Sequence, residues 1–252
     1  MRVLLWKELL EQWRSYRILI VVAVLVAMGI LGPLTARYMN ELLLAIPGTP
    51  PGLESVLPKP DVTLGVQQLV KNLAQFGVIL ALLVPMASVV GEKSSGTAAI
   101  TLSKPVSRAA FLAAKFGALK VVFLTGILLS TLAGYAYLGM LFQWLPPSGF
   151  VALAALMALY MLTYASLALF ASSVAPSQLA AAGLAIGLAL VLGILGAVPQ
   201  FAAYLPGSLV GWGEALALGK SADLSWGAAG VSFGIIIVAF LSAWLAFRRQ
   251  EL

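Results

Sequence analysis

Six long apolar stretches alternate with polar segments along the chain. They are Ile18–Leu34, Leu73–Val90, Val121–Leu141, Phe150–Phe170, Leu179–Val198 and Ala228–Phe247. None of them contains Asp, Glu, Lys or Arg. A bilayer core of roughly 30 Å is crossed by a helix of about 17 to 25 apolar residues. The pattern therefore predicts an all-α, polytopic membrane protein with six transmembrane helices, forming a single transmembrane domain over residues 1–252.

Prolines and glycines mark where these spans are expected to end or bend. Gly32 and Pro33 are expected to close the first span, and Pro85 is expected to kink the second without breaking it. The connector 36–72 is expected to be a long loop, because its middle, residues 47–61, is rich in proline and glycine. The segment 199–227 is apolar but repeatedly broken. It fits either two half-helices dipping into the membrane or an interfacial loop.

Residues 1–17 predict an amphipathic helix ahead of the first span. At 100° per residue, one broad face is apolar and carries Val3, Leu5, Trp6, Leu9, Leu10, Trp13 and Tyr16. The opposite arc is polar and carries Lys7, Glu8, Glu11, Gln12, Arg14 and Ser15. Tryptophan on the apolar face with mixed charges opposite is typical of a helix lying in the headgroup plane. Such a helix either only anchors the first span or also presents its polar face to a cytoplasmic partner.

The charges are few and unevenly placed. Only 10% of the residues are charged, against roughly 25% in soluble domains, which excludes a soluble globular protein. An even number of spans puts both termini on one side, and that side holds eleven Lys and Arg against four on the other. This bias predicts a multi-pass protein of the inner (plasma) membrane with both termini in the cytoplasm. The net charge of +6 is then a topology signal, and nucleic acid is not an expected partner.

The side chains that most often carry catalysis are missing. Cysteine and histidine are absent, and no stretch matches the phosphate-loop pattern G-x-x-x-x-G-K-[ST]. The hydroxyls in the spans, such as those of Thr125, Ser130 and Thr163, are interpreted as hydrogen-bonding groups between helices. We therefore expect no catalytic residue, no metal site and no cofactor on this chain. An ion-driven carrier is expected to bury ionisable groups, so energy for any transport would come from another chain.

The segment Gly91–Lys120 carries five basic residues and one acidic residue on the expected cytoplasmic side. Thr97–Leu102 predicts a short helix between Gly96 and Pro105. Ser107 suits the N-cap of a second helix that enters the third span. A simple turn would need only a few residues. The length of this segment therefore indicates that it presents a surface to the cytoplasm.

One run in this segment resembles the cytoplasmic signature of type-2 (ABC-2 type) exporter permeases, the membrane subunits of ATP-binding-cassette transporters. The resemblance rests on Glu92, Ser95, Gly96, Thr97, Leu102, Lys104, Pro105, Val106, Ser107, Arg108, Phe111, Leu112 and Lys115. The layout of the rest of the chain agrees with that family: an amphipathic first helix, six spans, and a broken apolar segment before the sixth.

The resemblance implies a non-enzymatic half-transporter. Two copies of the permease, expected to be identical, would each bind a separate ATPase subunit that carries ATP and magnesium. Residues Glu92–Leu102 would form a coupling helix that docks on the ATPase, and residues 1–17 would make a second contact. The coupling residues implied are Glu92, Ser95, Gly96, Thr97, Pro105 and Arg108, and those on the amphipathic helix are Trp6, Glu8, Glu11 and Trp13.

Two other functions remain open on the sequence. A secondary carrier or channel without an ATPase would need a polar pore, for which the spans offer hydroxyls. A membrane anchor for a larger assembly fits the composition but leaves the segment 91–120 without a role. The sequence leaves open the transported substrate and whether two paired copies are identical.

Overall fold

The computed structural model describes residues 2–47, 59–220 and 225–250, and every regular element within these ranges is a helix. The helices are α1 (Arg2–Arg14), α2 (Arg17–Leu44), α3 (Val62–Met86), α4 (Val90–Ser94), α5 (Thr97–Leu102), α6 (Arg108–Leu141), α7 (Pro147–Val174), α8 (Gln178–Gly196), α9 (Pro199–Ala202), α10 (Gly207–Ala217) and α11 (Trp226–Arg248). Six helical stretches are long and apolar enough to cross a membrane, and they correspond to the six predicted spans. The prediction of an all-α membrane protein with six spans is confirmed.

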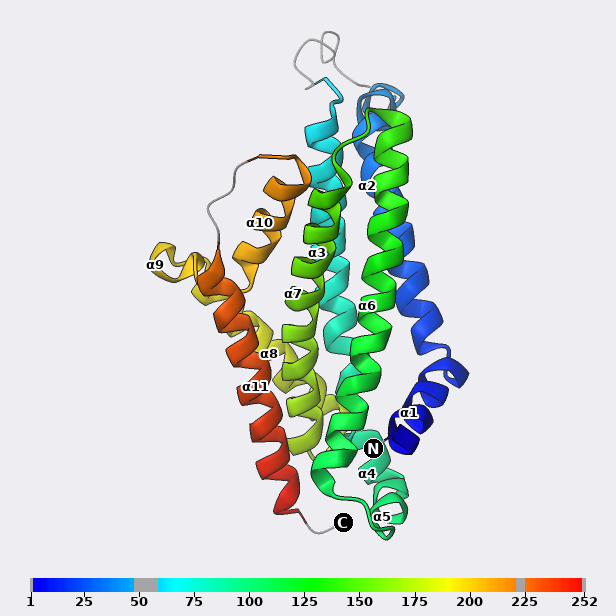
Figure 1. Ribbon diagram of the computed structural model, residues 1–252, viewed down its shortest axis with the longest axis vertical. Helices are drawn as coiled ribbons and strands as arrows, with labels where there is room; N and C mark the ends of the chain where they lie inside the picture. Colours follow the sequence, from blue (N-terminus) through cyan, green and yellow to red (C-terminus); the bar gives the residue numbers. More distant parts are fainter. Residues whose placement is uncertain (1, 48–58, 221–224, 251–252) are drawn as a thin grey trace.

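The long helices α2, α3, α6 and α7 run side by side as an elongated bundle (Figure 1). Helix α1 begins and α11 ends at the same end of this bundle, where α4 and α5 also lie (Figure 1). We call this the terminal end and the opposite one the distal end. The end of α2, the start of α3, the connection between α6 and α7, and helix α10 lie toward the distal end.

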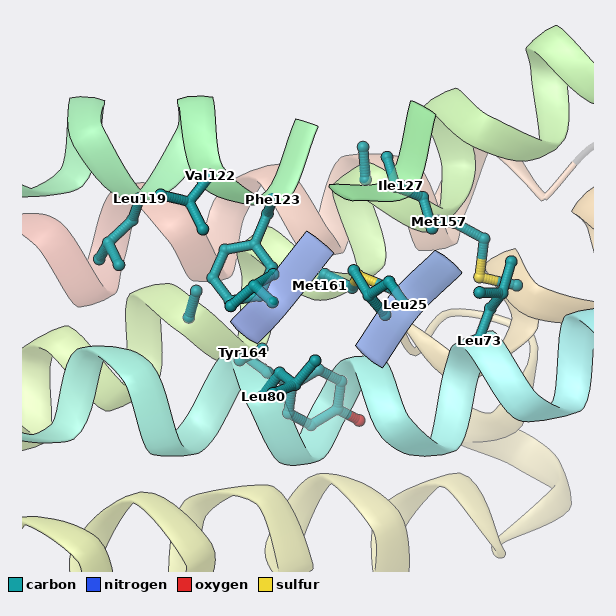
Figure 2. Packing of buried hydrophobic residues seen from close by; sticks show 14 of the residues in the cluster. Leu25, Leu73, Leu80, Leu119, Val122, Phe123, Ile127, Met157, Met161 and Tyr164 are labelled. Atoms are coloured by element: carbon teal, nitrogen blue, oxygen red, sulfur yellow. The ribbon is translucent and has the colours of Figure 1, made fainter. Parts of the chain in front are cut away.

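The core lies where these four long helices meet. Leu25 of α2, Leu73 of α3, Phe123 of α6, and Met157 and Met161 of α7 are fully buried and interdigitate (Figure 2). Helices α8 and α11 are peripheral, because only 11% and 22% of their apolar windows are buried, against 56% for α3 and for α7. Packing of side chains holds helices together inside a bilayer, where lipid is as apolar as the core. The four-helix core therefore contains most of the large, fully buried side chains of the described residues.

Close packing at two glycines surrounds the proline that was expected to end the first span. A Cβ at Gly29 would lie 2.5 Å from the carbonyl oxygen of Ser130 in α6, and one at Gly32 would lie 2.6 Å from the Cα of Leu69 in α3. Neighbouring helices thus hold this stretch on two sides, and a proline is tolerated in such a membrane helix. The prediction that Gly32 and Pro33 end the first span was wrong, because α2 continues through Pro33 to Leu44.

The connector between the first two spans is correspondingly shorter than predicted. Helix α3 begins at Val62, after Asp61, whose carboxylate accepts a hydrogen bond from the Leu64 amide at 2.7 Å. Residues 36–44 and 62–72, predicted to belong to a loop, are therefore helical. Most of the proline-rich middle of that loop lies outside the described residues.

Pro85 interrupts its helix, so the prediction of a simple kink was wrong. Proline has no N–H and presses on the preceding turn. Helix α3 ends at Met86, and the chain turns before α4 starts at Val90. The carbonyl of Pro85 accepts from the amide and hydroxyl of Ser88 at 2.9 and 2.7 Å. The amides of Val89 and Val90 instead donate to the hydroxyl of Ser172 in α7, at 3.0 and 3.1 Å.

We expect the substitution Ser172→Ala to lower the free energy of unfolding by about 1 to 3 kcal/mol, because two buried amides lose their acceptor. The neighbouring Ser173→Ala is the matched control, since the Ser173 hydroxyl donates only within its own turn, to Phe170. Thermal unfolding of the detergent-solubilised variants measures the difference. Equal unfolding temperatures for the two variants would show that Ser172 does not stabilise the turn between α3 and α4.

The segment between α8 and α11 forms two helices rather than a free loop. The four-residue α9 is followed by α10, which packs on α7 and touches α3. Leu209 and Trp212 of α10 are buried against Leu156 and Tyr160 of α7. The ring of Trp212 also makes an edge contact with Trp226, with centroids 5.3 Å apart. The described part of this segment is thus helical over Pro199–Ala202 and Gly207–Ala217, whereas its predicted entry into the membrane stays a prediction.

Candidate functional site

Helix α1 turns its polar side toward the rest of the protein. Glu8 and Gln12 are each only 3% exposed. Trp6 and Trp13 point away from the bundle and are 65% and 68% exposed. The two faces differ in part from the predicted pattern. Arg14 and Ser15, predicted on the polar arc, are exposed beside Trp13. Leu5, predicted on the apolar face, instead contacts α6 at Gly117. The polar side chains on the inner face are therefore available to bond with other helices of this chain.

Two charges of α1, Lys7 and Glu8, close into a ring at the terminal end with Glu92 of α4 and Lys115 of α6. Lys115 Nζ lies 3.1 Å from Glu8 Oε2 and 2.9 Å from Glu92 Oε1. Lys7 Nζ lies 3.1 Å from Glu8 Oε1 and 2.9 Å from the same Glu92 oxygen. Positive and negative groups alternate around this four-charge ring. It joins α1, α4 and α6, which are far apart in the sequence.

Burial makes the four-charge ring sensitive to the loss of Glu8, Lys115 or Glu92. Lys115 is 2% exposed and Glu92 is 9% exposed. Removing one partner of a buried pair leaves an uncompensated charge, which costs far more than a surface ion pair contributes. Burial alone would lower the pKa of Lys7, but the carboxylates of Glu92 and Glu8 outweigh it and raise that pKa above its ordinary value. Lys7 is therefore cationic throughout the physiological pH range.

The carboxylates of Glu8, Glu11 and Glu92 offer oxygens within 4.8 Å of one another. Such a group could hold a cation. Here the ammonium groups of Lys7 and Lys115 already occupy the position between Glu8 and Glu92, and Glu11 pairs with Lys7 at 3.6 Å. The arrangement is an ion-pair cluster, in which lysines supply the positive charge.

Helices α4 and α5 form a helical hairpin at the tip of the terminal end. Gly96 lies between them with φ of 71°, a left-handed conformation that glycine adopts without strain. The hydroxyls of Ser95 and Thr97 both donate to the carbonyl of Glu92 at 3.3 Å, and lie 2.9 Å from each other. The predicted helix Thr97–Leu102 is confirmed. The range Glu92–Leu102, expected to form one coupling helix, is instead divided between α4 and α5, because the left-handed Gly96 breaks it.

The hairpin is followed directly by the helix of the third span. The amide of Ala110 donates to the Ser107 hydroxyl at 3.1 Å, which confirms Ser107 as the N-cap of α6. From there α6 runs without interruption to Leu141. A displacement of the hairpin would therefore reach a transmembrane helix through one short connection.

Two basic side chains, Lys93 of α4 and Arg108 at the start of α6, bind the hairpin and the start of α6 to the ends of other spans. Lys93 Nζ donates to the carbonyls of Ser173 and Ala175 at the end of α7, at 3.0 and 3.1 Å. Arg108 donates to the carbonyls of Phe247 and Arg248 at the end of α11, at 2.6 and 2.9 Å. Cations are favourable at helix C-termini, where carbonyls lack intrahelical partners. The hairpin region is thus tied to α7 and α11 as well as to α1 and α6.

The outer surface of the hairpin is open. Ile100 is 67% exposed although it is apolar, whereas Ala98 is buried and Leu102 packs against the core. The other exposed residues of the tip are small or polar, namely Ser94, Ser95, Gly96, Thr97, Ala99, Ser103, Lys104 and Pro105. This surface presents one apolar side chain among small ones at the extreme end of the bundle.

The structure brings some of the implied site residues together and separates others. Glu8 and Glu92 meet in the four-charge ring, with Glu11 beside it. Ser95, Gly96 and Thr97 form the turn of the hairpin, and Pro105 lies in the exposed loop that follows α5. Arg108 fastens α11, while Trp6 and Trp13 face outward from α1, away from the hairpin.

Sequence reasoning did not assign Lys7, Lys93 or Lys115 to the site. For Lys115 a signal existed. It lies at helical spacing among Phe111, Leu112, Phe116 and Leu119, and those four apolar residues are buried. A lysine on the buried face of a helix requires a carboxylate partner.

Comparison with known proteins agrees with this architecture. Residues 2–209 match the family model described as ABC-2 family transporter protein. The chain is also 30% identical over 257 residues to an uncharacterized transmembrane protein of Bacillus subtilis (strain 168), YxlG, in an alignment that covers 100% of this chain and 98% of that protein. The six apolar helices fit the membrane part of a transporter of this kind. The chain therefore belongs to the ABC-2 transporter family, as a multi-pass membrane subunit of the permease type.

Proposed function

We propose that this chain is the permease of an exporter powered by a separate ATP-binding-cassette ATPase, which docks on the α4–α5 hairpin. The observation that carries the proposal is the contrast within the hairpin. Its tip is exposed, yet its base is tied through Glu92 and Lys93 to α1, α6 and α7, and α6, which follows it, is bonded through Arg108 to the end of α11. A segment built in this way can receive a push at its tip and pass it to most of the bundle.

Ile100 and the small residues around Gly96 would fit into a depression on the ATPase. Interfaces of this kind rely on a few apolar anchors surrounded by small and polar contacts. When ATP closes the pair of ATPase subunits, the hairpins would move with them. The four-charge ring would then carry α1 along, and the bundle would rock between two states. ATP and magnesium would bind only to the ATPase.

We infer that the terminal end faces the cytoplasm. The support is the distribution of eleven Lys and Arg toward this end against four toward the other. The exposed tryptophans of α1 would then lie in the inner headgroup layer.

Thiol labelling in intact cells checks this orientation without background, because the chain has no cysteine. We expect Ser94→Cys, at the hairpin, to resist an impermeant thiol reagent. We expect Lys220→Cys, an exposed position at the distal end, to react. Lysed cells serve as the control in which both react. Labelling of Ser94→Cys in intact cells would contradict the orientation and, with it, the docking of a cytoplasmic ATPase.

A second copy of the permease is the expected partner within the membrane. Helix α8 supports this proposal, since it buries little surface in one copy and its Gly183 and Gly187 have no neighbouring atom within 4 Å of a Cβ position. Such a surface permits close approach of another helix.

The function itself is tested with the purified chain and its ATPase in liposomes. The complex should hydrolyse ATP and move substrate together, whereas the chain alone should do neither. Uptake driven by an ion gradient with the chain alone would instead establish the secondary carrier.

A further inference from the structure

One face of α3 is polar where a membrane helix is expected to be apolar. Gln67, Lys71 and Gln75 follow one another at a spacing of four residues and are all exposed. The same face continues toward the terminal end with Ile79 and Leu83, which are 50% and 48% exposed. The exposed face of α3 is therefore polar in its distal half and apolar in its terminal half.

The polar half lies at the level of the apolar spans rather than in a loop. Lys71 lies between Leu69, whose backbone packs on Gly32 of α2, and Gly77, which packs on Met161 of α7. Lys71 is also nine residues into α3, about 13 Å along the helix from Val62. The sequence placed Lys71 in a loop because α3 was predicted to start later.

Nothing in the described part of the chain satisfies these three side chains. No carboxylate oxygen there lies within 4.0 Å of Lys71 Nζ, and neither glutamine makes a side-chain hydrogen bond. Polar side chains turned toward lipid are costly and mark binding sites or transport pathways. Lys71 can extend toward the distal surface, but Gln75, one turn deeper, is too short to do so.

A groove lies where the polar half of this face meets the apolar half. It has a volume of about 480 Å³ and is lined by Ala74, Gln75, Phe76, Val78, Ile79 and Tyr160. Tyr160 of α7 also lines a neighbouring cavity formed by α8, α9 and the start of α10. Tyr160 thus contributes to both depressions.

We propose that this face of α3 binds an anionic amphiphile, with its acidic head at Lys71 between the two glutamines and its apolar chain along Ile79 and Leu83. The charge of Lys71 selects an acidic group, and the order of polar and apolar residues matches a molecule with its head toward the distal surface. A second copy packed symmetrically and without water on the same face would bring like charges together, which is unfavourable. The proposal rests on the proposed transport function and names the class of its substrate.

The test uses the cysteine-free chain with the single substitution Gln75→Cys, reconstituted in vesicles of neutral lipid without any ATPase. An anionic thiosulfonate reagent should modify this cysteine about tenfold faster than its cationic analogue, because of the nearby lysine. Dodecyl phosphate should slow the reaction about tenfold at saturation. Lys71→Gln in the same background should remove both the preference and the protection. Leu128→Cys, on a lipid-facing position of α6 that is 62% exposed, should react slowly with both reagents.

Four results would overturn the proposal. The first is reactivity of Gln75→Cys as low as that of Leu128→Cys. The second is equal protection by dodecylphosphocholine, which has the same chain but no net charge. The third is equal protection by inorganic phosphate, which has no chain. The fourth is an efficient disulfide between two copies at position 75, which would show that a second copy covers this face. Because no ATPase is present, these results do not depend on whether the proposed energy coupling is correct.

Discussion

Replacing Lys115 with methionine is expected to lower the free energy of unfolding by about 3 to 5 kcal/mol, the usual cost of breaking a buried ion pair. Methionine keeps most of the apolar stem of the lysine, so the loss of unfolding free energy is caused by removal of the charge. Glu8 and Glu92, which Lys115 bridges, would be left with Lys7 alone. Denaturant unfolding in detergent measures the effect, and proteolytic release of α1 shows whether that helix detaches first.

Lys120→Met is the matched control for this prediction. Lys120 lies on the same helix but is exposed, so its replacement should change stability by about 0.5 kcal/mol or less. Adding Glu8→Gln and Glu92→Gln to Lys115→Met should recover part of the lost stability. The two buried carboxylates that lost their partner are then replaced by neutral amides. If Lys115→Met is as harmless as Lys120→Met, the four-charge ring does not hold α1 to the bundle.

The second large effect concerns Gly96 at the tip of the hairpin. We expect Gly96→Trp to prevent stable association with the ATPase and to abolish transport-linked ATP turnover, because a large ring would stand on the docking surface. The position has room for it in the permease alone, as no atom lies within 4 Å of a Cβ built there. Co-purification and ATP turnover of the reconstituted complex measure the result.

Gly96→Asn separates docking from backbone strain. Both substitutions place a side chain at a residue with φ of 71°, at a cost of about 1 to 2 kcal/mol for most residues and less for asparagine. The asparagine variant should retain the ATPase, and the two permeases should unfold at similar temperatures. Retention of the ATPase by Gly96→Trp would mean that the tip of the hairpin is not the docking surface.

The boundaries of the spans could be predicted where a helix is apolar all round. Helices α8 and α11 fall within two residues of the predicted stretches 179–198 and 228–247. The extensions of α2 and α3 were missed because they are polar, and hydropathy alone ends a span at the first charges. Local signals were present nonetheless, in the N-cap Asp61 and in the pair Arg37–Glu41 at helical spacing.

Helix α5 and the start of α6 were predictable because their signals are local, whereas α4, its turn onto α5 and the four-charge ring were not. Gly96 and Ser107 mark the start of α5 and of α6 in the sequence itself. The ring depends on contacts between Lys7 and Glu92 and between Glu8 and Lys115, across three helices that only the packed bundle brings together. One consequence is that Glu92→Lys would place a third lysine inside the ring and disturb the fold. Exposed residues such as Ile100 therefore probe docking more cleanly than Glu92.

Cross-linking from Ile100 shows whether the ATPase docks on the tip of the hairpin. The substitution Ile100→Cys, the only cysteine in the permease, is coupled to a short heterobifunctional reagent in the complex with its ATPase. We predict that the main cross-linked product joins the permease to the ATPase, and that the same cysteine is shielded from an impermeant reagent in intact cells. An Ile100→Cys variant that is labelled from outside the cell would contradict the cytoplasmic position of the hairpin. One that never cross-links to the ATPase in an active complex would contradict docking at its tip.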